Sequence, residues 1–373
     1  MSIQSHERVP YVDIAAQHAP IKDELITAIS EVIDSGQFIH GEQVGTFEHQ
    51  FSELCEVPYS VAVNSGTDAM ILALRALSVG PGDEVITVPN SFVASTSCIA
   101  LVGARPVFVD VGPDLNMDVS LLEAAITPRT KAILPVHLTG RPSEMDPIIE
   151  IADRHNLYVI EDCAQAVTAE YKGKKVGSIG TIGCFSLHPL KTLNACGDGG
   201  ILTVNDQYLY DRLITLRNHG LKTRDDCEVW GINSRLDTLQ AAILLVKLKY
   251  LGEWTTERRA NALFYQETLD SIPRLTLPSD LPHGKSVYHT FVVQTEQRDE
   301  LKQFLANDGV ETAIHYPKPI HLQESAASLG YSDGDFPVAE SQARHILSLP
   351  IHSDLEKDDL NLVANSIRAF YSG

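Results

Sequence analysis

Short apolar runs alternate with amphipathic segments along the first half of the chain. The apolar runs are continuous rather than alternating with polar residues, which favours strands buried on both faces of a parallel sheet. We expect these strands at 60–63, 84–88, 106–111, 131–136 and 157–161. Segments with helical spacing separate them, at 67–77, 92–101, 119–126 and 145–155. The alternation predicts an α/β protein whose sheet is covered by helices on both faces.

The pattern changes at both ends of this region. Residues 1–20 are expected to form an arm, and helices are expected at 22–34, before a Ser-Gly stop signal, and at 45–55. Beyond residue 206 the spacing predicts helices at 207–218, 238–251, 251–264, 298–308 and 355–371, with strands at 286–294 and 311–315. A chain of 373 residues exceeds one ordinary core, so we expect a large domain at 1–250 and a small one at 251–373.

Composition narrows the class of protein. Hydrophobic residues make up 44% of the chain and charged residues 21%, as in ordinary globular enzymes. The net charge of −20 argues against nucleic acid or an anionic membrane as a main partner, so any phosphate site must be made locally. No apolar run reaches the ~18 residues of a membrane span. The six cysteines lack CxxC spacing, which predicts reduced thiols, no metal site and a cytoplasmic location.

The stretch from 158 to 202 carries the chemistry. Asp162 follows an apolar strand, where a carboxylate needs a partner, and Lys191 stands among Pro189, Leu190 and Leu193 without other charges. A carboxylate that keeps a pyridine nitrogen protonated and a lysine that forms a Schiff base are what a pyridoxal phosphate site requires. Read locally, Asp162 is equally well a helix N-cap and Lys191 a surface lysine.

Four other segments have polar or aromatic residues at the expected sheet edge or in loops. Residues 64–69 place Ser, Gly and Thr at a helix start, where free N–H groups favour an anion, although a plain N-cap is the simpler interpretation. Phe92 follows the next strand and could stack on a flat ring or belong to the core. Segments 231–237 and 315–321 read as a capped turn and a pocket-lining loop. No GxGxxG or GxxxxGK[ST] motif occurs, so Rossmann and P-loop readings have no support.

Together these motifs resemble the DegT/DnrJ/EryC1/StrS sugar aminotransferases over nearly the full length. The resemblance is carried by NSGTDAM (64–70), VIEDCAQA (159–166), GCFSLHPLKTLNACGDGG (183–200), GINSRLDTLQAA (231–242) and IHYPKPIH (314–321). It implies a fold-type I, aspartate aminotransferase-like architecture, with a mostly parallel seven-stranded sheet in the large domain and a smaller C-terminal α+β domain.

The resemblance also implies roles for matching residues. Lys191 would form the Schiff base and Asp162 would pair with the pyridine nitrogen. The other implied cofactor contacts are Gly66, Thr67, Asp68, Phe92, Gln165, Ser186 and, across a homodimer interface, Asn233. The implied substrate contacts are His188, Arg235, His315, Tyr316 and His321. At position 188 many relatives carry an aromatic residue, so substrate contacts do not transfer directly.

The implied reaction moves an amino group from L-glutamate to a nucleotide-linked ketosugar, with pyridoxamine phosphate as the intermediate form of the cofactor. Such enzymes serve surface-glycan, including lipopolysaccharide O-antigen, or deoxyaminosugar biosynthesis. The motifs at 231–242 and 314–321 favour a 3-keto sugar linked to UDP or dTDP. The alternatives are a 4-keto sugar aminotransferase or a pyridoxal phosphate-binding regulatory protein.

Overall fold

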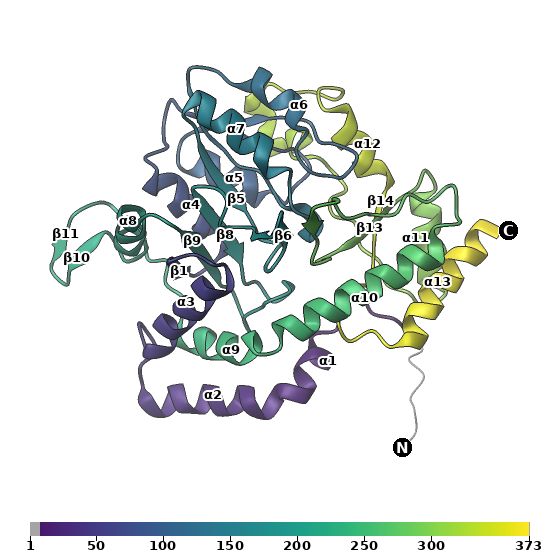
Figure 1. The fold of residues 1–373 in the computed structure, drawn as a ribbon, viewed down its shortest axis with the longest axis horizontal. Helices are drawn as coiled ribbons and strands as arrows, with labels where there is room; N and C mark the ends of the chain where they lie inside the picture. Colours follow the sequence, from purple (N-terminus) through teal and green to yellow (C-terminus); the bar gives the residue numbers. More distant parts are fainter. Residues whose placement is uncertain (1–7, 373) are drawn as a thin grey trace.

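A seven-stranded sheet forms the centre of the molecule. The computed structural model describes residues 8–372, and the sheet has the order β1-β9-β8-β5-β4-β2-β3 (Figure 1). Its strands are β1 (Tyr59–Val63), β2 (Glu84–Thr87), β3 (Arg105–Phe108), β4 (Thr130–Ile133), β5 (Tyr158–Asp162), β8 (Ile182–Ser186) and β9 (Gly200–Val204). Strand β9 pairs antiparallel with both β1 and β8, and all other pairs are parallel. Six strands therefore run in one direction, and their carboxyl ends meet at one edge.

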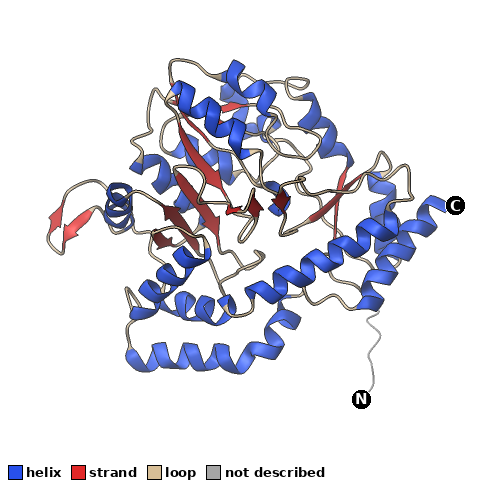
Figure 2. Cartoon of the chain, in the orientation of Figure 1, coloured by secondary structure: helices blue, strands red, loops and turns tan. Residues whose placement is uncertain are grey.

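Helices cover both faces of this sheet (Figure 2). Their apolar sides pack on strands that are buried along most of their length, as the continuous apolar runs require. These helices are α3 (Glu42–Leu54), α4 (Gly66–Ala76), α5 (Ala94–Leu101), α6 (Val119–Leu122), α7 (Met145–His155), α8 (Gln207–Arg217) and α9 (Thr238–Leu248). Helices α1 (Ile14–His18) and α2 (Lys22–Ser35) precede them, and α2 lies beside α9.

The C-terminal part has a core of its own. Helix α10 (Leu251–Leu269) runs from α9 toward α11 (Arg298–Asn307) and α13 (Lys357–Ser372), and these pack around the antiparallel pair β13 (Phe291–Gln294) and β14 (Ile346–Leu349). Residues from 320 to 346, including α12 (Pro337–His345), instead contribute apolar side chains to the core of the large sheet. The division at residue 250 falls between α9 and α10 and stays a prediction.

The remaining regular elements are short. Strand β6 (Glu170–Tyr171) pairs with β7 (Lys174–Lys175) and β12 (Gly284–Lys285), and β10 (Leu221–Thr223) forms a hairpin with β11 (Asp226–Cys227). The 3-10 turns are η1 (Ala19–Ile21), η2 (Glu123–Ala125), η3 (Leu138–Gly140), η4 (Ile320–Leu322) and η5 (Glu324–Leu329).

Several elements differ from the sequence-based expectation. The expected arm contains α1, while its residues 1–7 lie outside the described part. The helix expected at 92–101 begins only at Ala94, and the one expected at 119–126 turns into a 3-10 helix after Leu122. The strand expected at 286–294 begins only at Phe291, and His289 and Thr290 before it line a cavity. The strand expected at 311–315 is reduced to one bridge between Ala313 and Ser348, because the chain then bends toward the same cavity.

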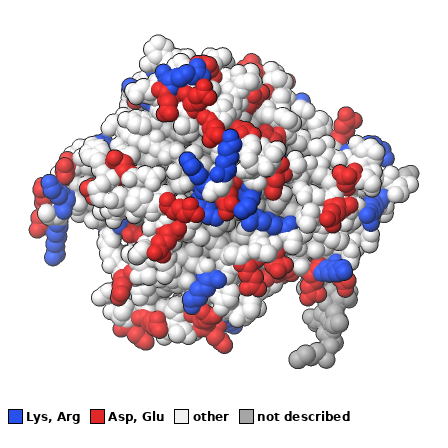
Figure 3. Space-filling model, viewed as in Figure 1, with Lys and Arg blue, Asp and Glu red and all other residues white. Residues whose placement is uncertain are grey.

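Charged side chains of both signs are scattered over the face of the molecule in Figure 3, where Lys and Arg gather near the centre among acidic groups. Ion pairs within the described residues include those of Lys175 and Lys285 with Glu170. Among residues 8–372, the helices are too short or too polar to cross a lipid bilayer.

Candidate active site

A cavity of about 390 Å³ opens at the carboxyl edge of the sheet. Loops that follow the parallel strands supply much of its wall, as expected for an α/β sheet. Ten residues predicted from the sequence line it: Gly66, Thr67, Phe92, Asp162, Gln165, Ser186, His188, Lys191, His315 and Tyr316. These residues come from distant parts of the chain, and the fold brings them to one site.

Lys191 lies in the connection between β8 and β9, and its side chain lines the cavity. Its backbone N–H donates to the carbonyl of His188 at 2.8 Å, but no residue within the described part hydrogen-bonds its Nζ. Burial lowers the pKa of Lys191 to about 8, and the negative charge of Asp162 opposes this shift. The amine is therefore partly uncharged near neutral pH and can act as a nucleophile or a base.

Asp162 ends β5 and is 3% exposed. The Ser95 hydroxyl donates to Oδ2 at 2.7 Å, and the backbone N–H of Ala164 donates to Oδ1 at 3.1 Å. Ser91 and Ser95 are themselves joined by a hydroxyl contact of 2.8 Å. No helix starts after Asp162, so it is not a helix N-cap, and the carboxylate faces the cavity.

The start of helix α4 forms another wall of the cavity. Ser65 caps the helix by accepting the N–H of Asp68 at 3.1 Å, and Gly66 and Thr67 follow in the first turn, where N–H groups and the helix dipole favour an anion. A Cβ on Gly66 would lie 2.7 Å from the Cβ of Ser186, so the absence of a side chain keeps the two segments together. Asp68 does not line the cavity, and its charge complements the helix dipole instead.

Aromatic and amide groups line the outer wall. Gln165 accepts the N–H of Thr139 at 2.7 Å and donates to the Tyr316 hydroxyl at 3.4 Å, which fixes its amide. Burial raises the pKa of Tyr316 to about 12, so its hydroxyl stays protonated. Phe92 is 54% exposed, with its ring centroid 5.8 Å from that of Tyr316. Phe92 is thus a cavity residue and not part of the core.

The enclosed histidines of the site are uncharged near neutral pH, because burial lowers their pKa. Burial lowers the pKa of His315 to about 4, and Lys191 adds to the shift; its Nδ1 lies 2.9 Å from the Ser348 hydroxyl. His188 is exposed at the cavity wall. The cavity is also lined by four residues that were not predicted from the sequence, His289, Arg258, Tyr11 and His352. Their positions depend on how α10 and the segments at 286–290 and 350–354 pack, and no local motif marks them.

Besides Asp68, three predicted residues lie outside the cavity. His321 is buried, and its Nε2 lies 3.0 Å from Glu340 while its ring packs on Phe336, so we do not retain it as a substrate contact. Arg235 donates to Asn218 at 3.2 Å outside the cavity. Asn233 is exposed and also outside the cavity of its own chain; its contact with a second subunit stays a prediction.

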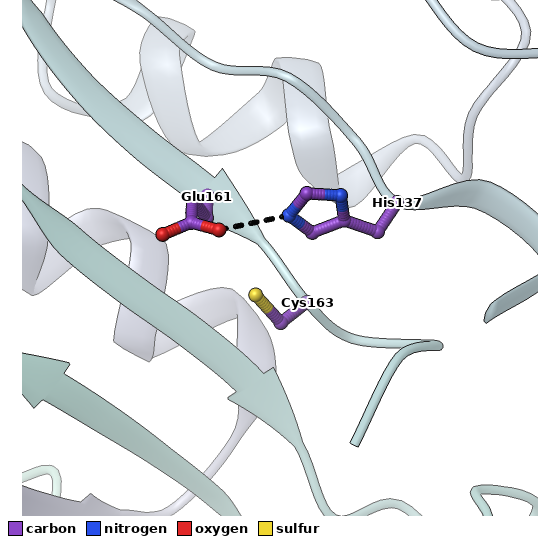
Figure 4. A group of neighbouring side chains, drawn as sticks. All are labelled: His137, Glu161 and Cys163. Carbon is purple, nitrogen blue, oxygen red and sulfur yellow. Dashed lines mark hydrogen bonds and ion pairs between the residues drawn. The ribbon is translucent and has the colours of Figure 1, made fainter. Parts of the chain in front are cut away.

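A buried group of His137, Glu161 and Cys163 lies behind the site (Figure 4). The Ser143 N–H donates to His137 Nδ1 at 3.0 Å, so Nε2 carries the ring proton and donates to Glu161 at 3.0 Å. Glu161 also accepts the N–H groups of three residues, Gly177, Ile179 and Gly180. With these lone pairs occupied and burial raising the pKa of the Cys163 thiol, the cluster serves as a support for β5 and not as a metal site.

The fold and the site define a class: an α/β enzyme with a lysine and a buried carboxylate in one cavity at the carboxyl edge of a mostly parallel sheet, the arrangement of an aminotransferase. The model of the DegT/DnrJ/EryC1/StrS aminotransferase family matches residues 20–368. The chain belongs to this family.

Relatives and solved structures match over nearly the full length. The dTDP-3-amino-3,4,6-trideoxy-alpha-D-glucose transaminase of Streptomyces venezuelae is 43% identical over 97% of this chain and 96% of its own. The UDP-N-acetyl-3-dehydro-alpha-D-glucosamine 3-aminotransferase of Acidithiobacillus ferrooxidans is 43% identical over 98% of both chains.

Among structures, Streptomyces venezuelae DesV in complex with a ketimine intermediate superposes with a TM-score of 0.97 at 42% identity, covering 98% of this chain and 99% of that one. The PLP form of the sugar aminotransferase Spr1654 from Streptococcus pneumoniae, itself described as putative, gives 0.89 at 27% identity, over 94% and 96%. These matches confirm the expected family and fold.

Proposed function

We propose that this protein is a pyridoxal phosphate-dependent aminotransferase that moves the amino group of L-glutamate to C3 of a nucleotide-linked ketosugar. One observation carries the proposal: a cavity at the sheet edge holds both the amine of Lys191, which has no hydrogen-bond partner among residues 8–372, and the buried carboxylate of Asp162. Membership of an aminotransferase family and the PLP form of a neighbouring structure support it.

The residues present fit the cofactor. Lys191 would hold its aldehyde carbon, and Asp162 would accept the hydrogen bond of its ring nitrogen. The N-terminus of α4, with Thr67 and Ser186, would hold the phosphate, and Phe92 and Gln165 would border the ring. When bound, the cofactor withdraws electrons from the carbon that loses or gains a proton. The hydroxyl of Ser95 keeps Asp162 oriented for its role.

The proton transfer belongs to Lys191. With the cofactor and donor bound, Nζ would remove the proton from the α-carbon of the donor and would later deliver a proton to the carbon of the sugar. Burial excludes water from this amine and keeps its pKa near 8, so that both protonation states are accessible. The uncharged imidazoles of His289 and His315 nearby do not compete as cations.

The sugar carbon is assigned from the relatives. Both enzymes named above are transaminases that form 3-amino sugars, which favours C3 over the 4-keto alternative and over a purely regulatory role. Their nucleotides differ, so we propose a dTDP- or UDP-linked substrate. We further propose a cytoplasmic homodimer with shared active sites, in which Asn233 reaches the neighbouring cavity, acting in surface-glycan or deoxyaminosugar biosynthesis.

The test of this function is a direct assay. The purified protein, loaded with pyridoxal phosphate, is incubated with L-glutamate and with 3-keto or 4-keto sugars linked to UDP or dTDP. Formation of 2-oxoglutarate follows the donor, and the NMR spectrum of the product locates the new C–N bond. Amination at C4, or no amination of any ketosugar, would refute the proposed substrate.

Replacing Lys191 tests the chemistry itself. Lys191→Ala should reduce turnover by at least about 10³-fold, because the covalent attachment and the proton transfer both use its amine. The variant should also lose the visible absorbance of the bound cofactor. Lys131→Ala, an exposed lysine on β4, is the control and should keep full activity. A Lys191→Ala enzyme with near-normal turnover would disprove the assignment.

A further inference from the structure

Arg258 is a buried cation in the cavity wall. It lies outside the sequence motifs that the family shares, and none of them assigns it a role. It lies on helix α10, is 6% exposed, and lines the same cavity as Lys191. Arg258 also contacts His289, since its Nη1 donates to the His289 carbonyl at 3.4 Å, and His289 lines the same cavity as Lys191. Two basic side chains therefore line one cavity, in a chain whose net charge is −20.

The hydrogen bonds of Arg258 are incomplete. Nη1 donates to the carbonyls of Tyr288, His289 and Ile351 at 3.3, 3.4 and 3.5 Å, all long contacts. Nε is buried and has no partner in the described part of the chain. No carboxylate between residues 8 and 372 forms an ion pair with this guanidinium, although a buried charge is normally paired.

The groups around Arg258 do not supply the missing negative charge. Burial raises the pKa of Tyr11 and lowers that of His352, so both stay neutral, and the Nε2 of His352 is taken up by the carbonyl of Pro10 at 3.3 Å. Asp354 acts on Arg258 only at a distance, and its Oδ2 accepts the hydroxyl of Ser353 at 2.9 Å. A ligand anion would complete this site.

We propose that Arg258 is the anchor for a carboxylate of the amino donor. This inference rests on the proposed function. In an amino acid, the carboxylate is bonded to the same carbon as the amino nitrogen, so its site must lie in the cavity that contains the reacting lysine. Arg258 and Lys191 line the same cavity, which meets this requirement. The diphosphate of a sugar nucleotide is attached at C1, away from the carbonyl at C3, and belongs nearer the cavity mouth.

The neighbouring arginine provides a matched control. Arg259 lies next on the same helix, and its Nε donates to the carbonyl of Ser286 at 2.8 Å, but it does not line the cavity. Arg258→Gln and Arg259→Gln thus remove the same charge from adjacent positions and disturb similar contacts with backbone carbonyls. Arg258→Lys, which keeps a positive charge, serves as a second variant in case the glutamine variant folds poorly.

The first measurement is the binding of glutarate, a dicarboxylate without an amino group, to the cofactor-loaded proteins by calorimetry. Loss of one charge-assisted hydrogen-bonding partner should weaken binding by about 10- to 100-fold in Arg258→Gln, with an intermediate loss in Arg258→Lys. Arg259→Gln should bind glutarate like the wild-type protein. Equal affinity in all variants, or an equal loss in Arg259→Gln, would overturn the proposal.

The second measurement separates the two half-reactions by the absorbance of the cofactor. Arg258→Gln should raise the glutamate concentration needed for half-maximal conversion by a similar factor, and leave the half-reaction with the amino sugar nucleotide within about threefold of wild type. A matching loss in the sugar half-reaction would assign Arg258 to the nucleotide diphosphate instead and refute the donor anchor. If the wild-type protein itself did not react with glutamate, the proposed function would fail, independently of Arg258.

Discussion

At the scale of single residues, the site depends on two side chains in opposite electrostatic situations. Lys191 is half-buried in the cavity wall and has no hydrogen-bond partner for its Nζ in the described structure, and the lowered pKa of its amine favours loss of the proton. Asp162 is a buried carboxylate that receives two hydrogen bonds, which hold it in its orientation. The amine is therefore available to react, and the carboxylate is held in place.

The lowered pKa of Lys191 gives a pH dependence. Only the uncharged amine attacks an aldehyde, so the rate at which the cofactor-free protein combines with pyridoxal phosphate should rise with pH and level off above about 8. Stopped-flow absorbance at several pH values measures this rate. A rate that keeps rising toward about pH 10, as for an ordinary lysine, would contradict the assigned effect of burial.

Ser95 is expected to position Asp162. Ser95→Ala removes a buried hydrogen bond to the carboxylate, which should weaken cofactor binding by about 5- to 30-fold and shift the pH at which the bound cofactor changes its absorbance. Ser95→Thr keeps the hydroxyl and should restore both properties. Ser97→Ala, on the same helix, is the control. If Ser95→Ala changes only thermal stability, the hydroxyl has no positioning role.

The sequence predicted the reacting residues better than the walls around them. Lys191 and Asp162 stand in motifs whose chemistry is local. In the structure the neighbouring Glu161 does not line the cavity, because successive strand residues point to opposite faces. Arg258, Tyr11 and His289 enter the cavity only through packing between distant segments. His321 shows the opposite error, since a histidine in a cavity loop turned out to bond Glu340 in the core.

At the scale of elements, long apolar or amphipathic segments were predicted correctly and marginal ones were not. The five expected strands of the large sheet are present, with boundaries that shift by one to three residues. Helix α12 (Pro337–His345) was not predicted, because it buries polar side chains such as Glu340 and Gln342. Strands β8 and β9 contain glycine, serine and threonine, and tertiary pairing rather than residue preference makes them strands.

Strand β5 should depend on Glu161 for its stability. Glu161→Gln replaces an acceptor of four hydrogen bonds with an amide whose NH₂ must face donors, so we expect a loss of about 3 kcal/mol in the free energy of unfolding. Urea unfolding measures the loss. The exposed Glu123, which pairs with Arg154 and His155, is the control, and Glu123→Gln should have a far smaller effect. Equal losses would show that the buried cluster is not a support.

At the scale of the whole molecule, exposed apolar groups indicate a partner surface. Trp230 is 85% exposed beside the β10–β11 hairpin, which projects from one end of the molecule in Figure 1. Phe92 and Leu190, at 54% and 51%, are exposed at the cavity itself. Such side chains at a functional site commonly become buried in an interface, in agreement with the proposed homodimer with shared cavities.

Trp230 offers a test of that assembly. Trp230→Glu should shift the protein from dimer toward monomer in sedimentation experiments and lower its activity in parallel, because a charge would be placed in an apolar contact. Leu263→Glu, an exposed apolar position on α10, should leave the dimer intact. A wild-type protein that sediments as a monomer at all concentrations would rule out the shared site.

The reversed strand β9 has a consequence for how this architecture can diversify. Because β9 lies antiparallel beside β8, with Ser186 opposite Gly200, the connection from 187 to 199 leaves and returns at the same sheet edge. Lys191 therefore lies in a connection that is held at both ends by strands of the sheet. Segments such as 310–321 can vary in length and composition without moving it. The segments that select the substrate can therefore change separately from the segment that carries the lysine. Exchanging such cavity segments between relatives should change the substrate and leave the type of reaction unchanged.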